Sequence, residues 1–284
     1  MQKAKKIAEE LRSRFTPATE QEIVNAIREY LQTILLQSIY QSKWGAALSF
    51  LGGTALRICY DLKRYSEDLD FTLDDKKKPY QFSLLIDHLK KEMTLRGFEV
   101  SISFREDKIV QKGFISFAGL EGPLAFRSFR KGQKIHIKLE VDIQPVPLKE
   151  GDRESFFVNR FQEIFPILKH TLPTLFAGKI LAVLCRSHFC GRDYYDLIWY
   201  LTRKTELNLD YVNRGMKKTT FRDERGLLDA VGKKVKEVTP SLILKDIGPF
   251  LEDPQESKWI ERYHELFEQL QKSRLGQHVP SMTS

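Results

Sequence analysis

Hydrophobic side chains recur at three- and four-residue spacing from residue 20 to residue 41, and this period predicts an amphipathic helix. A short apolar run follows at 47–51, stops at Gly52-Gly53 and resumes up to Tyr60. Because two glycines between apolar runs mark a tight turn, this order predicts a strand, a turn and a helix.

Alternation of apolar and polar residues predicts several strands in the middle of the chain. The first is a half-buried strand around Leu69 and Phe71, and a stretch with the helical period follows it at 81–96. We expect further strands, and hence a mixed α/β unit, at 97–104, 109–117 and 134–143.

The period changes to 3.6 residues from Thr174 onward, which predicts helices for the rest of the chain. The preceding stretch, 145–173, contains four prolines, and we expect it to lack long regular elements. The sequence therefore predicts two domains. Residues 1–150 form an α/β (α+β) domain with a mixed sheet and N-terminal helices, and residues 151–284 form a mostly helical domain.

The composition fits a folded protein with a positive charge. Of its 284 residues 42% are hydrophobic, and 46 Lys and Arg against 38 Asp and Glu give a formal charge of +8. The hydrophobic share excludes a disordered or collagen-like chain. The charge suits a polyanionic partner such as nucleic acid or nucleotide, but proteins without such partners reach the same value.

Cysteine content and hydropathy indicate a protein of the cytoplasm. The three cysteines form no CxxC pair, so neither a disulfide framework nor a thiolate zinc site is expected. The first residues lack the apolar core of a signal peptide, and no window reaches the roughly 18 apolar residues of a membrane span. We therefore expect a cytoplasmic location and no membrane contact.

Two carboxylates stand two residues apart on the strand predicted around Leu69. Asp68 and Asp70 project from one face, because side chains alternate across a strand, and they can converge on one divalent ion. Oxygen ligands without histidine or thiolate suit Mg²⁺ better than zinc, and Mn²⁺ is the alternative ion. The sequence therefore predicts a magnesium site at this strand.

The Gly52-Gly53 turn has the features of a phosphate site. Without Cβ atoms the backbone can approach a phosphate closely, and the N-terminus of the following helix favours an anion. Thr54 adds a hydroxyl donor. Most Gly-Gly-Thr turns only connect two elements, so the prediction depends on the order along the chain, in which Asp68 follows Thr54 by fourteen residues.

In this order the two motifs resemble the nucleotidyltransferase superfamily of DNA polymerase beta type, and within it the AbiEii/AbiGii toxin family, which includes the MenT toxins. The Gly-Gly-Thr-Ala-Leu stretch at 52–56 is similar to the family's first motif. The Arg-x-Ser-x-Asp-Leu-Asp-Phe stretch at 64–71 is similar to its metal-binding motif. The resemblance implies a nucleotidyltransferase-type fold with the active site in the cleft between its two domains.

The resemblance also implies roles for individual residues. Asp68 and Asp70 would hold the Mg²⁺ that bridges the triphosphate of an NTP substrate, and the glycine turn would hold the phosphates for attack by an acceptor oxygen. Contacts to the nucleotide are implied for Gly52, Gly53, Thr54, Arg64, Ser66 and Arg186.

A third carboxylate is implied on a neighbouring strand. Residues 136–142 alternate strictly, so His136, Lys138, Glu140 and Asp142 share one face. Alternation alone fits the exposed face of any half-buried strand. In the superfamily an acid on this strand completes the metal site or acts as base, and because Lys138-Leu-Glu140 is similar to the family's strand, we rank Glu140 above Asp142.

A lysine helix and a second pair of acids extend the resemblance. The family carries a lysine on a helix before an Arg-Asp-x-Tyr-Asp-Leu motif, matched here by Lys179 and by residues 192–197. The resemblance implies that Lys179, together with Arg64 or Arg186, offsets the charge of the triphosphate. Its acidic partner is either Asp193 or Asp196, and a salt bridge to Lys179 or Arg186 is the competing structural role of both acids.

The resemblance makes tRNA the expected acceptor, because relatives in the toxin family modify tRNA acceptor ends. Residues 212–236 carry eight cations against three acids and can form a groove for RNA, although such charge runs are usually solvated helix faces. The family also implies a toxin opposed by a separately encoded antitoxin. Two alternatives remain open: transfer of a nucleotide to a protein hydroxyl or a small molecule, and a non-catalytic RNA-binding module.

Overall fold

The computed structural model describes residues 20–120 and 132–276, which belong to two compact units. The first unit contains the described residues up to Pro145 together with Arg153–Lys169. The second contains Val146–Asp152 and the described residues from His170 onward. Residues 1–19 of the region in which N-terminal helices are predicted lie outside the described residues.

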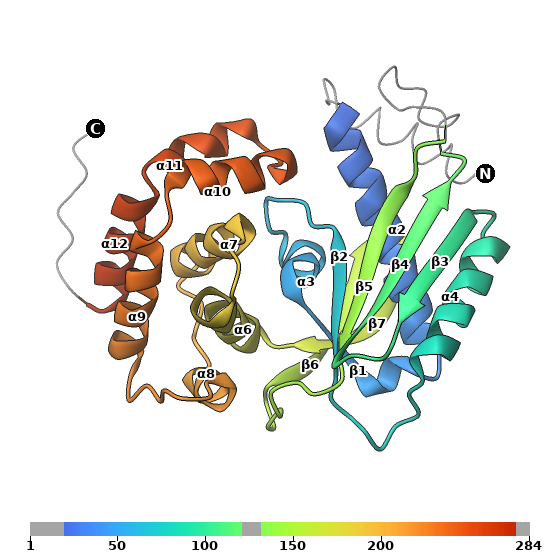
Figure 1. Ribbon diagram of the computed structural model, residues 1–284, viewed down its shortest axis with the longest axis horizontal. Coiled ribbons are helices and arrows are strands. Elements are labelled where there is room, and N and C mark those ends of the chain that lie inside the picture. The colour runs from blue at the N-terminus through green and yellow to red at the C-terminus, as the bar shows by residue number, and fades with distance from the viewer. Residues whose placement is uncertain (1–19, 121–131, 277–284) are drawn as a thin grey trace. The chain divides into compact units, whose positions relative to one another are not determined.

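A seven-stranded mixed sheet forms the core of the first unit (Figure 1). Its strands are β1 (Leu48–Leu51), β2 (Asp68–Leu73), β3 (Glu99–Arg105), β4 (Val110–Ala118), β5 (Ile135–Asp142), β6 (Arg153–Arg160) and β7 (Glu163–His170). They lie in the order β3-β4-β5-β2-β1-β7-β6. β2 pairs parallel with β5, and β1 pairs parallel with β7. β1 with β2, β3 with β4, and β4 with β5 pair antiparallel, so the predicted mixed sheet is confirmed.

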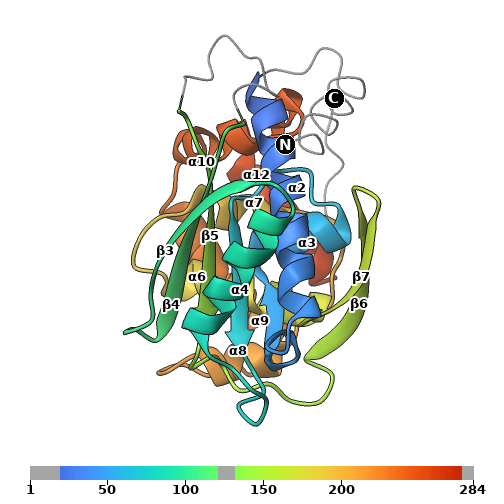
Figure 2. The same ribbon diagram turned by 90° about the vertical axis from the view of Figure 1, so that its right-hand side faces the viewer.

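Helices cover one face of this sheet (Figure 2). They are α2 (Glu20–Gln41) and α4 (Phe82–Leu95), while α3 (Gly52–Tyr60) follows β1 and the short 3₁₀ helix η1 (Gly45–Ala47) precedes it. A Cβ atom on Gly113 of β4 would lie 2.8 Å from Ile86 of α4, so this face of β4 packs on the helix. Because side chains alternate along a strand, Lys112 and Phe114 point away from α4.

The helix predicted at 20–41 is confirmed as α2, but it is buried on more sides than an amphipathic helix requires. Its buried residues include Glu29 and Thr33 as well as the apolar stripe. Glu29 forms an ion pair with Arg57 of α3 at 2.9 Å, and the Thr33 hydroxyl donates to the Glu29 carbonyl at 2.8 Å. Buried polar groups need such partners, and the hydrophobic period does not reveal them.

The other elements predicted in this unit are confirmed to within about two residues. The strand expected around Leu69 is β2, and the helix expected at 81–96 is α4. The strands expected at 97–104, 109–117 and 134–143 are β3, β4 and β5.

The expectation that 145–173 lacks long regular elements is wrong. β6 and β7 each extend over eight residues there and continue the sheet beyond β1. Pro166 lies inside β7, three residues before Lys169, the residue that pairs with Phe50 of β1. A proline costs a strand only the hydrogen bond of its missing N–H and is tolerated where no neighbour needs that donor. The chain therefore returns to the sheet after residue 150 before the helices begin.

From Leu172 onward the regular elements of the second unit are helices, as the 3.6-residue period predicts. The Phe176 and Tyr200 rings stack in its core with centroids 4.5 Å apart. In residues 20–120 and 132–276, no helix combines the length and apolar character needed to cross a membrane. The elements are α6 (Leu172–Cys185), α7 (Gly191–Thr202), α8 (Leu209–Gly215), α9 (Glu224–Lys236), α10 (Pro240–Ile247), η2 (Gly248–Phe250), η3 (Pro254–Glu256), α11 (Ser257–Glu261) and α12 (Tyr263–Arg274).

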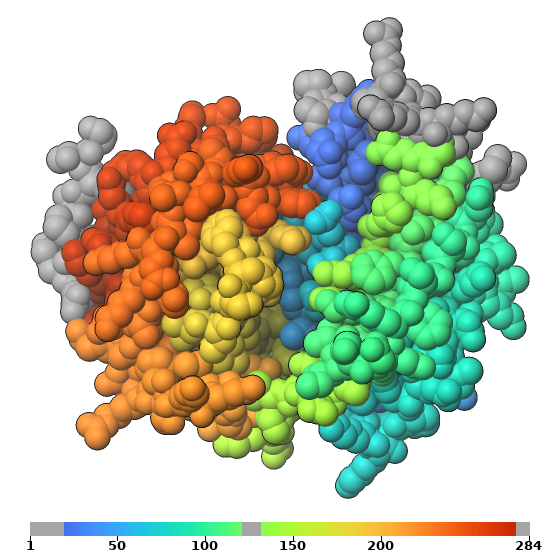
Figure 3. All heavy atoms as spheres, viewed as in Figure 1, coloured from blue at the N-terminus to red at the C-terminus, as the bar shows by residue number. Residues whose placement is uncertain are grey.

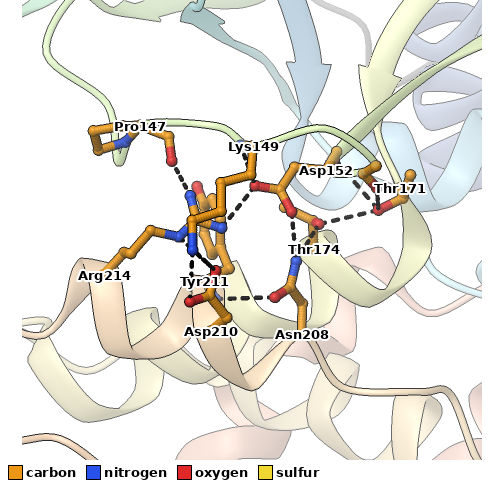
Figure 4. Close-up of polar contacts among 10 residues, drawn as sticks. Pro147, Lys149, Asp152, Thr171, Thr174, Asn208, Asp210, Tyr211 and Arg214 are labelled. Atoms are coloured by element: carbon orange, nitrogen blue, oxygen red, sulfur yellow. Dashed lines mark hydrogen bonds and ion pairs between the residues drawn. The ribbon is translucent and has the colours of Figure 1, made fainter.

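Asp152 ties the segment Val146–Asp152 to α8 (Figure 4). Its carboxylate accepts hydrogen bonds from the Lys149 backbone N–H, from Asn208 and from Arg214, each at 2.7 Å. Asn208 also caps the start of α8. Burial raises the pKa of Asp152, but the hydrogen bonds from Lys149, Arg214 and Asn208 outweigh burial and hold this pKa below its usual value.

We predict that Asp152→Ala lowers the free energy of unfolding by about 2 to 4 kcal/mol at pH 7, because Arg214 and Asn208 lose their buried acceptor. Since the folded-state pKa lies below the unfolded value of about 3.9, the contribution is full above that value and is lost as the pH falls through the folded-state pKa. Thermal unfolding at pH 7 and at acidic pH measures both effects. Asp210→Ala removes an exposed partner of Arg214 and, as the control, should change Tm far less. Equal Tm values of Asp152→Ala and wild type at pH 7 would contradict this account.

Candidate functional site

The Gly52-Gly53 turn lies against the carboxylate strand. Gly52 begins α3 directly after β1 with a φ of +81°, a left-handed conformation that favours glycine. A Cβ atom on Gly52 would clash with Oδ2 of Asp70, and one on Gly53 would lie 2.6 Å from Nη2 of Arg64. A side chain at either position would therefore have to displace Asp70 or Arg64, and at Gly52 the positive φ also favours glycine.

Thr54, Arg64 and Ser66 surround the same turn. The Thr54 hydroxyl donates to the backbone carbonyl of Asp68, and the threonine is fully buried. Arg64 is also buried, and the Ser66 hydroxyl lies 3.1 Å from the position that a Cβ atom on Gly53 would take. Thr54 thus fastens the turn to β2, and Arg64 places a positive charge beside Gly53.

Three carboxylates meet where β2 pairs with β5. In the parallel register Asp70 lies beside Glu140, and Asp68 lies beside Lys138. On its other side, Asp70 is paired with Leu51, the last residue of β1. The glycine turn, Asp70 and Glu140 therefore occupy adjacent positions across three strands.

Two lysines stand among these carboxylates. Nζ of Lys138 lies 3.0 Å from Oδ2 of Asp68 and 3.5 Å from Oε1 of Glu140, while Nζ of Lys112 lies 2.5 Å from the same Oε1. Partial burial lowers the pKa of Lys138, but the charges of Asp68, Glu140 and Asp70 outweigh burial and raise it. Lys138 is therefore protonated at neutral pH. Solvent reaches 20% to 31% of the side chains of Asp68, Lys112, Lys138 and Glu140, so the cluster is accessible.

Asp142 occupies a different position on β5. Its partner on β2 is Thr72, two residues beyond Asp70, and its carboxylate accepts the Gln144 backbone N–H at 2.9 Å. Burial raises the pKa of Asp142, and the hydrogen bond from Gln144 offsets this only in part. Of the two acids proposed on this strand, Glu140 is the one adjacent to Asp70.

The donor chemistry of this cluster fits a hard divalent cation. Mg²⁺ usually takes one or two carboxylates from a protein together with substrate phosphates, and Asp68 and Asp70 supply such a pair beside the glycine turn. Within the described ranges, 20–120 and 132–276, no group of three or more His, Cys, Asp and Glu side chains is placed to hold a metal ion. Glu140 would have to leave Lys112 and Lys138 to join the two aspartates.

Lys179, Asp193 and Asp196 form a second charge cluster, which belongs to the second unit. Nζ of Lys179 in α6 lies 2.7 Å from Oδ1 of Asp193 and 2.8 Å from Oδ2 of Asp196, both in α7. Nη1 of Arg186 lies 3.0 Å from Oδ2 of Asp193. The side chain of Asp196 is fully buried, whereas that of Arg186 is 37% exposed. Both acids contact the lysine, so the salt bridge expected as a structural role is present for each.

The cations of the basic stretch 212–236 lie in two different environments. Arg214 is held by Asp152 at 2.7 Å and by Asp210 at 2.9 Å, so it belongs to the network of Figure 4. The remaining cations include those of α9, which lines a groove of about 410 Å³ with α12. Cations that line this groove are Arg225, Lys233, Lys236 and Lys272.

Sequence patterns do not identify Lys112 as part of the carboxylate cluster. Its strand was predicted, but a lysine that alternates with apolar residues is typical of any half-exposed strand. Only the antiparallel register of β4 with β5, which places Lys112 beside Glu140, brings it to the site.

Two crystal structures from Helicobacter pylori have a similar fold. JHP933 superposes with a TM-score of 0.53 at 16% identity, over 89% of this chain and 94% of that chain. A protein described as a candidate nucleotidyltransferase superposes with a TM-score of 0.54 at 16% identity, over 88% of this chain and 96% of that chain. At this identity the likeness shows the fold alone. No curated protein sequence matches the chain.

The fold and the family comparison together define the class of this protein as a nucleotidyltransferase. More narrowly, the chain belongs to the nucleotidyl transferase AbiEii toxin family of type IV toxin–antitoxin systems, whose sequence model matches residues 34–275. This match confirms the resemblance inferred from the two motifs.

Replacing Gly52 tests whether its close approach to Asp70 is required. We predict that Gly52→Ala lowers the free energy of unfolding by about 1 to 3 kcal/mol, because alanine is strained at this φ and its Cβ atom meets the Asp70 carboxylate. Gly178→Ala is the matched control, since no atom lies within 4 Å of the added Cβ atom, and it should stabilise α6 by up to about 1 kcal/mol. Urea unfolding measures both changes. A Gly52→Ala protein as stable as wild type would show that the turn tolerates a side chain.

Proposed function

We propose that this nucleotidyltransferase transfers a nucleotide from an NTP to the 3′ end of tRNA in a Mg²⁺-dependent reaction. The proposal depends on one observation, the adjacent placement of the glycine turn, Asp70 and Glu140 on neighbouring strands. This places a backbone site suited to phosphate beside carboxylates suited to a divalent ion. The choice of tRNA comes from the family resemblance, and the cations between α9 and α12 support it by their charge.

In the proposed reaction the turn holds the triphosphate. Gly52 and Gly53 place their backbone groups at the start of α3, where the helix N-terminus favours negative charge. Arg64 adds a buried positive charge beside Gly53, and Ser66 lies next to it. Positioned donors and cations of this kind stabilise the charge that develops on a transferring phosphoryl group.

In the proposed reaction the carboxylates bind the metal ion and act on the acceptor hydroxyl. Asp68 and Asp70 hold Mg²⁺, which when bound stabilises negative charge on the phosphate oxygens. Glu140, next to Asp70, either adds a third carboxylate or accepts the proton of the acceptor hydroxyl. The acceptor oxygen forms a bond to the α-phosphorus of the NTP, and the bond to the leaving pyrophosphate breaks.

The second charge cluster enters the proposal through the family resemblance. Asp193 and Asp196 fix Lys179 in α6, and Arg186 extends the cluster toward solvent. We assign Lys179 the role of offsetting phosphate charge, and the two acids the role of positioning it.

The biological setting follows the family. Type IV toxin–antitoxin membership makes an antitoxin the proposed partner and an NTP the proposed substrate. We propose that the enzyme acts in the cytoplasm and that its transfer to tRNA is the toxic activity.

A transfer assay with α-labelled NTPs, Mg²⁺, total tRNA and total protein tests the reaction. We predict label on RNA, and a loss of at least about 10³-fold in rate for Asp68→Asn and Asp70→Asn, because each removes a charged ligand from the proposed centre. Glu140→Gln should lose about 10² to 10⁴-fold, the range of a general base. Asp142→Asn is the matched control on the same strand and should stay within about tenfold of wild type, since Asp142 lies beside Thr72.

Other outcomes have distinct meanings. Label on protein alone would assign the acceptor to a protein hydroxyl. Label on RNA that persists in Asp70→Asn, or no label in any fraction, would contradict the proposed function.

A further inference from the structure

The face of the sheet that carries Lys112 and Glu140 continues as an open surface over β4 and β3. The opposite face of β4 packs on α4, since a Cβ atom on Gly113 would lie 2.8 Å from Ile86 and 3.7 Å from Phe82. Figures 1 and 2 show α2 and α4 on the same side of the sheet, and Figure 3, which has the view of Figure 1, shows green atoms of β4 at the surface. Residues that alternate with Gly113 therefore face outward.

One aromatic side chain interrupts this polar face. Phe114 is 44% exposed, although its neighbours across the sheet are Ser103 on β3 and Lys138 on β5. Among residues 20–120 and 132–276 it makes no ring contact, unlike the exposed Phe104 on the other face, which packs on Phe82. The ring thus remains available for a partner of its own.

Polar groups suited to a nucleotide surround this ring. The Ser116 hydroxyl and Nδ1 of His136 lie 2.9 Å apart, and this pair is two residues along the strands from the pair of Phe114 and Lys138. Arg105 is exposed on β3, directly beside Lys112. We call Ser103, Arg105, Phe114, Ser116 and His136 the Phe114 platform. An aromatic ring with cations and hydroxyl groups on an open sheet face is the composition by which proteins bind single-stranded RNA.

The platform and the glycine turn lie on opposite sides of the carboxylates. Across the sheet the order is β1, β2, β5 and β4, so Gly52 directly after β1 comes first, Asp70 second and Glu140 third. Phe114 on β4 comes last and lies beside Lys138, two residues before Glu140. In phosphoryl transfer the attacking and leaving oxygens are roughly in line. With the triphosphate at the turn, the acceptor approaches from the side of β4.

We propose that the Phe114 platform binds the terminal nucleotide of the single-stranded RNA acceptor. The base stacks on Phe114, and Arg105 offsets the charge of the RNA backbone. This assignment rests on the proposed function, which places the triphosphate at the turn and the reaction at Asp68 and Asp70.

Binding of an eight-nucleotide single-stranded RNA ending in CCA tests the platform. The RNA carries a 5′ fluorophore, and the full chain carries Asp70→Asn, so that anisotropy reports binding without turnover. We expect Phe114→Leu to weaken binding roughly tenfold, which corresponds to about 1.4 kcal/mol for the loss of one stacked base. Phe157→Leu is the matched control, since Phe157 is 67% exposed on β6 of the same sheet, and it should leave the affinity within about twofold.

Steady-state kinetics in the otherwise wild-type chain distinguish binding of the RNA acceptor from binding of the NTP. The platform predicts that Phe114→Leu raises KM for RNA about tenfold and leaves KM for NTP unchanged. A rise in KM for NTP alone would overturn the assignment to the acceptor, and unchanged RNA binding with intact transfer would overturn the platform while the proposed function stands. If the wild type transfers no nucleotide and Phe114→Leu loses RNA binding, the platform would be supported and the proposed function rejected.

Discussion

The close placement of like charges on β2 and β5 is the constraint on which the candidate site depends. Asp68, Asp70 and Glu140 lie on adjacent positions of two parallel strands, where like charges destabilise the pairing. Lys138 and Lys112 offset that repulsion through ion pairs of 2.5 to 3.5 Å. The same lysines hold Glu140 in ion pairs, and the cluster presents carboxylate oxygens of the kind that a divalent ion binds. The glycine turn adds the proposed phosphate site to this cluster, because it places backbone rather than a side chain against Asp70.

The two charge clusters differ in how strongly a substitution within them is expected to change the stability of the protein. The side chains around Asp68 and Glu140 are 20% to 31% exposed, so removal of one charge leaves its partners in contact with water. Lys179 and Asp193 are nearly buried and Asp196 is fully buried, and loss of one member of such a set leaves an uncompensated charge in the interior. Variants of the first cluster therefore report on the reaction, whereas variants of the second change stability as well.

The hydrophobic period predicted which face of each strand carries the site residues, but not which residues of the neighbouring strands lie beside them. Alternation at 136–142 placed Lys138, Glu140 and Asp142 on one face of β5, and the structure confirms that face. Which acid lies beside Asp70 depends on the register between strands about seventy residues apart, and no period within either strand carries that information. Lys112, Phe114 and the strands β6 and β7 were missed for related reasons. Register, and whether a strand position can lack an N–H donor as Pro166 does, are properties of strand pairs rather than of single segments.

The central claim is that Asp68 and Asp70, beside the Gly52-Gly53 turn, form the centre that binds metal and nucleotide. The most direct measurement is an anomalous difference map from crystals grown with Mn²⁺ and a non-hydrolysable NTP. The account predicts a Mn²⁺ peak at ligand distance from the carboxylates of Asp68 and Asp70, with the triphosphate at the start of α3. A peak at another acidic group with the two aspartates still paired to lysine, or a triphosphate away from the turn, would contradict it.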